Sequence, residues 1–179
     1  MQAPKIKWSI DPSHSEIGFK VKHLMITNVK GEFRNFDATI YTTGEDFNNA
    51  EINFSMDPAS INTGDEKRDG HLKSADFFDL DNHRSITFTS RSLKSMDEEG
   101  VYELDGDLTI KGITKPVKLE VEFAGMMKDP WGNQKAGFTL SGKINRKEWG
   151  LNWNVPLEAG GMLVGEEVRI TADVQLVKQ

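Results

Sequence analysis

The densest group of side chains able to do chemistry lies in residues 65–71, DEKRDGH. Asp65 and Asp69 place two carboxylates close in sequence to the imidazole of His71, and such groups act as general acids and bases or bind metal ions. One hypothesis is therefore a small hydrolase that uses Asp69 and His71. The motif favours a second interpretation, in which these residues cap and solvate a surface helix. A third interpretation makes Arg68 and His71 candidate contacts for the polar headgroup of a ligand.

Other residues that could catalyse a reaction or bind a metal are poorly arranged for it. The four histidines are His14, His23, His71 and His83. They form no HxH or HExxH pair, so no metal ligands are predicted. Ser13 and Ser15 lack the GxSxG motif of a nucleophile elbow. The chain contains no cysteine, which excludes thiolate chemistry. We therefore predict no catalytic residue, no metal and no cofactor.

The composition excludes several kinds of partner. Acidic residues outnumber Lys and Arg by 28 to 22, and this net charge of −6 argues against a nucleic-acid partner. No apolar run reaches membrane-spanning length, so no stable membrane insertion is expected. The first residues lack the basic and apolar regions of a signal peptide. The chain as written is therefore predicted to be cytoplasmic, or periplasmic if a signal peptide was removed, and a homodimer is left open.

Most of the chain alternates apolar and polar residues with the period of a β-strand. In residues 101–122, for example, Tyr102, Leu104, Leu108 and Ile110 share one parity, and mainly polar or charged residues take the other. A period of two gives each strand one apolar face and one solvated face. The pattern therefore predicts strands whose apolar faces meet in a common interior.

The same alternation predicts about eight long strands. They span residues 16–22, 30–41, 48–56, 84–92, 101–110, 116–125, 136–146 and 166–177. The connections DEEG (97–100) and KGITKP (111–116) are hairpin-sized, which makes the strands that flank them antiparallel neighbours. The parity slips once near residues 34–35, where a β-bulge is expected to bend the chain.

Residues 62–78 interrupt the strand pattern and predict a short helical insertion. Asn62 or Thr63 is expected to cap this helix, because Asn and Thr side chains accept hydrogen bonds from the first backbone N–H groups of a helix. Its apolar residues are expected to dock on the strands: Leu72, Ala75 and Phe78.

An antiparallel chain of this kind forms either a sandwich or a barrel. Because the connections are mostly short and sequential, we predict an all-β, eight-stranded antiparallel barrel within a single domain, residues 1–179. The inward-facing set is rich in Phe, Leu, Ile and Trp and carries no charge. Such an interior is either a filled core or a pocket for one small ligand. Arg146 is expected to bond backbone carbonyls at one end of the barrel, and it is also a candidate headgroup contact.

Five segments together carry a family resemblance that spans nearly the whole chain. They are WSIDPSHSEIGFKVKHLMITNVKGEF (8–33), DEKRDGHLKSADFFD (65–79), ITFTS (86–90), GDLTIKGITKPV (106–117) and INRKEWGLNW (144–153). In this order they closely resemble the YceI-like family. The resemblance implies a lipocalin-like eight-stranded antiparallel barrel, with an elongated apolar pocket for a polyisoprenoid or another long-chain amphiphile.

The sequence therefore predicts a non-enzymatic protein that binds, sequesters or transports a long-chain isoprenoid or another lipid inside the barrel. The alternatives are the hydrolase described above and a stress-associated interaction module with a filled core. The side chains predicted to line the pocket are all apolar: Phe19, Val21, Phe33, Phe36, Phe54, Phe88, Leu104, Leu108, Leu119, Val121, Phe138, Leu140, Trp149 and Trp153.

Overall fold

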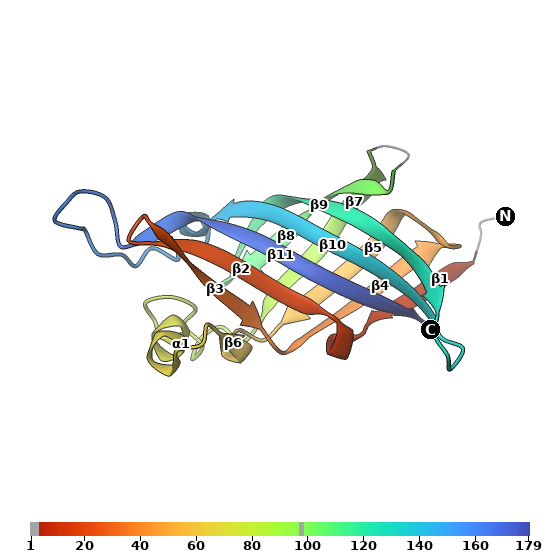
Figure 1. Cartoon of the computed structure of the whole chain (residues 1–179), viewed down its shortest axis with the longest axis horizontal. Helices are drawn as coiled ribbons and strands as arrows, with labels where there is room; N and C mark the ends of the chain where they lie inside the picture. The colour runs from red at the N-terminus through yellow and green to blue at the C-terminus, as the bar shows by residue number, and fades with distance from the viewer. Residues whose placement is uncertain (1–3, 97–98) are drawn as a thin grey trace.

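The computed structural model describes residues 4–96 and 99–179, and they form an elongated β-barrel with one short α-helix at one end (Figure 1). The strands are β1 (Lys5–Ile10), β2 (Glu16–His23), β3 (Thr27–Phe33), β4 (Phe36–Thr43), β5 (Asp46–Met56), β6 (Ile61–Asn62), β7 (Ile86–Ser95), β8 (Val101–Ile110), β9 (Ile113–Lys128), β10 (Gln134–Asn145) and β11 (Val164–Lys178). The helix is α1 (Glu66–Lys73), and the short 3₁₀ helices are η1 (Pro12–His14), η2 (Pro58–Ser60) and η3 (Arg146–Trp149). The predicted all-β fold with a short helical insertion is confirmed.

Eight strands close the barrel. Each strand of the ring is the antiparallel neighbour of the next, in the order β1, β4, β5, β7, β8, β9, β10 and β11. The ring closes because β11 also pairs with β1. This closure gives the first and last strands of the ring a hydrogen-bonded partner on both sides, which removes the exposed edges of an open sheet. The predicted eight-stranded antiparallel barrel is therefore confirmed.

The two hairpins predicted from sequence join neighbouring strands. β7 and β8 are antiparallel partners, although residues 97–98 of the DEEG connection lie outside the described residues. The turn between β8 and β9 is tighter than predicted, because Ile110 pairs directly with Ile113. Lys111 and Gly112 both have positive φ angles, of 53° and 73°, as a two-residue hairpin turn of type I′ requires.

Three strands of the barrel are interrupted at the same level. η1 separates β1 from β2, a two-residue break separates β3 from β4, and η2 separates β5 from β6. Pairing resumes beyond the breaks, because Ser9 pairs with Thr39 on one side and Ile17 pairs with Phe33 on the other. The predicted strand over 30–41 with a bulge is thus wrong in detail, since it is two strands, and β1 was not predicted at all.

Asp-Pro dipeptides mark two of these three breaks. They occupy residues 11–12 and 57–58. In both cases the Asp side chain accepts a hydrogen bond from the backbone N–H two residues further on, at 3.1 and 2.9 Å. Because proline cannot donate to a β-ladder and its ring fixes φ, the chain leaves the sheet for one turn at each of these positions.

At the α1 end, the hydrogen-bonded ladder of the barrel wall is interrupted between β6 and β7. β5 pairs with β7 only as far as Met56, which lies opposite Ile86. β6, which continues β5 beyond η2, pairs with β3 and with no other described strand. Residues 63–85, which include α1, occupy the space between β6 and β7 (Figure 1). This part of the wall is therefore closed by side-chain packing and not by a β-ladder.

α1 is shorter than predicted and begins at a different cap. The carboxylate of Asp65, not Asn62 or Thr63, accepts hydrogen bonds from the backbone N–H groups of Lys67 and Arg68, at 3.0 and 3.2 Å. These bonds, led by the one from Arg68, hold the pKa of Asp65 below its usual value. An ionised cap at this position also complements the positive end of the helix dipole.

The docking of the insertion follows the prediction in part. Leu72 and Phe78 pack against the barrel core as expected, but Ala75 is exposed. The chain leaves the helical path at Ser74, whose carbonyl accepts a hydrogen bond from the N–H of Phe77 at 3.0 Å. This turn buries Phe77 where the helical pattern placed Ala75. Within the described chain no helix is long and apolar enough to cross a bilayer.

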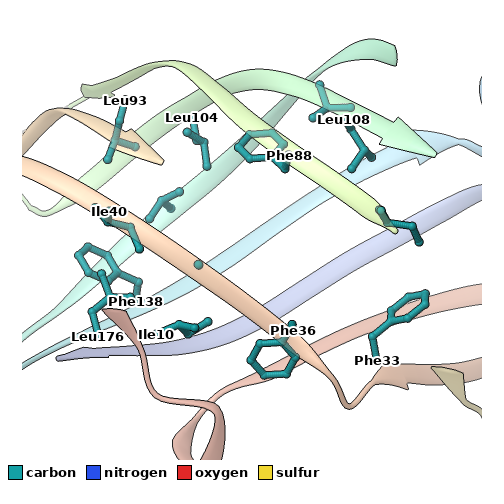
Figure 2. Packing of buried hydrophobic residues seen from close by; sticks show 14 of the residues in the cluster. Ile10, Phe33, Phe36, Ile40, Phe88, Leu93, Leu104, Leu108, Phe138 and Leu176 are labelled. Carbon is teal, nitrogen blue, oxygen red and sulfur yellow. The ribbon is translucent and has the colours of Figure 1, made fainter. Parts of the chain in front are cut away.

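Aromatic side chains seal the end of the barrel opposite α1, where β1 and the C-terminus lie (Figure 1). Trp8 is fully buried, and its ring centre lies 5.1 Å from that of Phe47. Phe47 in turn lies 4.9 Å from Phe138, which is 5.2 Å from Phe123. The indole N–H of Trp8 donates to the hydroxyl of Thr42 at 3.0 Å. Figure 2 shows the core side chains around Phe138.

Candidate ligand-binding cavity

A cavity of about 600 Å³ runs through the inside of the barrel. Its volume falls within the range of about 300–1,000 Å³ that is usual for small-molecule sites. Twelve of the fourteen residues predicted to line a pocket do line this cavity: Phe19, Val21, Phe33, Phe54, Phe88, Leu104, Leu108, Leu119, Val121, Phe138, Leu140 and Trp153. The interior is therefore hollow, and the filled core that the sequence left open is not what the structure shows.

Phe36 and Trp149 lie outside the cavity lining. The ring of Phe36 is buried and stacks on Phe54, at 6.4 Å between ring centres, and Phe54 itself lines the cavity. Trp149 belongs to η3 and not to a strand, so strand parity does not set its direction. It is almost fully buried, and its indole N–H donates to the carbonyl of Leu108 at 2.9 Å.

Glycines on neighbouring strands keep the aromatic rings against the wall. The ring of Phe19 lies over Gly31, and that of Phe88 lies over Gly106. A Cβ atom at either glycine would sit 2.3 Å from the nearest ring carbon, far inside van der Waals contact. Any larger residue at these positions would push the ring inward. The absence of a side chain at these two positions therefore preserves free volume in the barrel.

The cavity opens at the α1 end. Lys22 and Lys67 are the only exposed residues among those that line it, and they lie on β2 and α1. The opposite end is closed by the aromatic cluster around Trp8 and Phe47. Within the described residues the cavity is thus elongated, with a mouth at the α1 end and an apolar floor.

Arg146 forms a buried anchor beside this mouth. The side chain is 3% exposed and donates to four backbone carbonyls: those of Leu151, Trp153, Val164 and Gly165. Burial lowers the pKa of Arg146, and the nearby carboxylate of Glu166 opposes this effect. The expectation that Arg146 bonds carbonyls at one barrel end is confirmed, and its side chain also lines the cavity.

The other two candidate headgroup contacts, Arg68 and His71, lie on α1 and also line the mouth. Arg68 donates to the hydroxyl and the carbonyl of Thr63, at 2.7 and 2.8 Å. The ring of His71 meets the rings of Phe77 and Trp153 edge to face, with centres 5.1 and 4.5 Å apart. These contacts fix α1 across the opening of the barrel.

The structure does not assemble the predicted catalytic pair. Asp69 accepts hydrogen bonds from the N–H and hydroxyl of Thr63, at 2.9 and 2.6 Å. His71 instead pairs with Asp76, at 2.8 Å. Asp69 therefore holds the start of the helix, and no hydrogen bond joins it to His71.

A second polar cluster, on η1, also lacks the geometry of a catalytic triad. Nδ1 of His14 lies 3.2 Å from the hydroxyl of Ser13 and 2.9 Å from the carboxylate of Asp11. Because one nitrogen faces both partners, the ring cannot relay a proton between them. The hydrogen bonds to Asp11, first from Ser13 and then from His14, hold the pKa of Asp11 far below its usual value. Among the described residues, no group of three His, Asp or Glu side chains is placed to hold a metal ion.

The prediction that the interior carries no charge is wrong at the mouth. Lys22, Lys67, Arg68 and Arg146 all line the cavity. Lys22 lies on the outward parity of β2, but at the rim of a barrel side chains from either face of the wall can reach the opening. Sequence alternation alone gave no sign of this, because the rim is formed by segments far apart in the chain.

A closed antiparallel eight-stranded barrel around a one-ended apolar cavity defines a lipocalin-like fold. Within that class, this chain belongs to the YceI-like family, whose YceI-like domain matches residues 8–176. It is 42% identical over 169 residues to a UPF0312 protein of Staphylococcus aureus (strain USA300), covering 94% of this chain and 95% of that protein.

Solved structures agree with this assignment. The YCEI protein of Campylobacter jejuni is 29% identical, with a TM-score of 0.71, covering 94% of this chain and 96% of that chain. A polyisoprenoid-binding domain from Saccharophagus degradans has a TM-score of 0.69 at 16% identity, covering 96% of this chain and 98% of that chain. At that identity the second likeness shows the fold alone.

Proposed function

We propose that this protein binds a long-chain isoprenoid or another single-chain lipid inside the barrel and sequesters or transports it. The observation that carries the proposal is the elongated apolar cavity of about 600 Å³, sealed at one end and open at the other. A hydrocarbon chain fits such a space, because the wall offers apolar surface along the depth of the cavity. The polar end of the ligand then remains at the mouth, beside α1.

The energetics of chain burial support this class of ligand. Each buried methylene contributes about 0.8 kcal/mol, so a chain of about ten carbons gains about 8 kcal/mol. This gain is comparable to the estimated costs of association, which begin at several kcal/mol. The name of the Saccharophagus degradans domain, which shares the fold, records polyisoprenoid binding for that protein and points to the same class.

Native mass spectrometry of gently purified protein tests the proposal. We expect a species heavier than the bare chain, whose added mass corresponds to a long-chain lipid and is lost on organic extraction. The extracted protein should then take up a long-chain fluorescent probe. A bare mass before extraction, together with no uptake of the probe, would contradict lipid binding.

We further propose that the protein is not an enzyme. Asp69→Asn and His71→Ala should each lower stability by about 1–2 kcal/mol, because each removes hydrogen bonds that hold α1. Neither change should abolish a turnover. Esterase and phosphatase screens of the parent and both variants provide the measurement. An activity in the parent that either substitution eliminates would favour the hydrolase.

A further inference from the structure

The charged side chains that line the cavity all have the same sign. They are Lys22, Lys67, Arg68 and Arg146, accompanied by the titratable His23 and His71. The described lining residues include no Asp or Glu, although the chain as a whole has 28 acidic residues against 22 Lys and Arg. A random selection of charged residues from this chain would be mostly acidic. The positive charge of the side chains at the mouth is therefore a local property of this end of the barrel.

Contacts on the strand side bring the cations together. Arg146 donates to the carbonyl of Val164, and Val164 is the ladder partner of His23 on β2. Lys22 precedes His23 and lies beside Gly165, whose carbonyl accepts the hydrogen bond from the Arg146 Nε at 2.8 Å. Lys22 and Arg146 therefore lie on either side of the same two successive residues of β11, Val164 and Gly165.

Contacts on the helix side complete the group. Arg146 also donates to the carbonyl of Trp153 at 3.1 Å, and the ring of Trp153 packs against His71. Arg68 and Lys67 precede His71 by three and four residues on α1, so they occupy the same face of the helix. The cations from β2, α1 and η3 therefore surround one opening.

Little negative charge offsets this group. Within the described residues, none of the four Lys and Arg side chains forms a salt bridge. The carboxylate of Glu166, which faces Arg146, is bound by Lys147 at 2.9 Å. Asp65 attracts Lys67 and Arg68, but its carboxylate is already committed to the backbone N–H groups of the helix cap. Asp76 pairs with His71 at 2.8 Å, and Asp69 is bound by Thr63. These carboxylates are engaged elsewhere, so no salt bridge within the described residues neutralises the four cations.

We infer that the bound lipid carries an anionic headgroup, a carboxylate or a phosphate, which is held at this mouth while its chain fills the barrel. This inference rests on the proposed lipid binding and names the polar end of the ligand. Arg146 already donates to four carbonyls, so it attracts the headgroup through its charge. Lys22 and Lys67 are exposed on flexible stems and are free to contact the anion directly.

The test compares palmitate with hexadecanol, which share a hydrocarbon chain and differ in the charge of the headgroup. The delipidated protein should bind palmitate about tenfold more tightly at low salt, and the difference should shrink as salt is added. The double variant Lys22→Gln/Lys67→Gln should reduce this preference to about threefold or less. The control Lys7→Gln/Lys94→Gln removes the same amount of charge at exposed positions outside the cavity lining. This control variant should keep the preference for palmitate.

The outcomes separate this inference from the proposed function. Equal affinities for palmitate and hexadecanol in the parent protein would overturn the anionic headgroup and leave lipid binding intact. Failure to bind either probe would overturn lipid binding and the inference together. Acetate distinguishes a lipid headgroup from a free anion: displacement of palmitate by acetate at a similar concentration would also contradict the inference.

Discussion

Leu140→Trp should weaken the binding of a long-chain probe about 100-fold and leave the ligand-free protein nearly as stable as the parent. Leu140 is half-buried in the cavity wall, between its ladder partners Val121 and Ala172, which also line the cavity. An indole here would occupy the space of three or four methylenes of the ligand. This loss is about 3 kcal/mol, or roughly 100-fold in Kd. Probe titration and thermal melting of the delipidated protein provide the two measurements.

Ser141→Trp is the matched control, because Ser141 is the next residue on β10 and is exposed on the outer face. It should leave probe binding unchanged. If the interior were filled instead of hollow, Leu140→Trp would overpack it and cost roughly 1–3 kcal/mol. A large fall in the melting temperature of Leu140→Trp, with no probe binding by the parent, would show that the barrel is packed shut.

Arg146→Met should lower the free energy of unfolding by about 3–5 kcal/mol. The substitution leaves four backbone carbonyls without the donor that now binds them, and each such loss costs on the order of 1 kcal/mol. For a chain of this size the melting temperature should fall by about 10 °C. Hydrogen exchange should locate the effect in the backbone of residues 150–165, which the guanidinium ties to the barrel.

Two variants calibrate this result. Arg169→Met removes an exposed arginine from β11 and should change stability by about 0.5 kcal/mol or less. Arg146→Lys keeps the positive charge but cannot reach all four carbonyls, so its stability should lie between those of the parent and Arg146→Met. If Arg146→Met melted at the same temperature as Arg169→Met, the anchoring role of Arg146 would be refuted.

The strands could be predicted because a barrel wall with two different faces imposes its period on the sequence. On β10, Leu140 faces the cavity while Thr139 and Ser141 face solvent. The same rule placed Phe88 and Leu108 on the cavity wall, where they are opposite each other in the ladder. The closed barrel followed from these strands and from their short connections.

The features that strand alternation alone did not predict depend on contacts between distant segments. The hollow interior depends on rings such as Phe88 lying over a glycine of the next strand, and alternation is the same for a hollow barrel and a filled one. The basic mouth is assembled from β2, α1 and η3, which meet only in the folded chain. Strand parity therefore missed Lys22. The two Asp-Pro dipeptides were a local signal for the strand breaks that could have been used.

The open line between β6 and β7 gives the barrel wall uneven stiffness. A tube that is slit lengthwise at one end yields far more readily there than at the end where the ring is continuous. Because the ladder between β5 and β7 stops at Met56 and Ile86, residues 63–85 contribute no rung to the sheet, and their outward displacement would break none. Opening of the mouth would then require only repacking of side chains from residues 63–85, while the aromatic cluster at the opposite end keeps its contacts. Under the proposed lipid binding, entry of a hydrocarbon chain would then require no break in the β-ladder of the barrel.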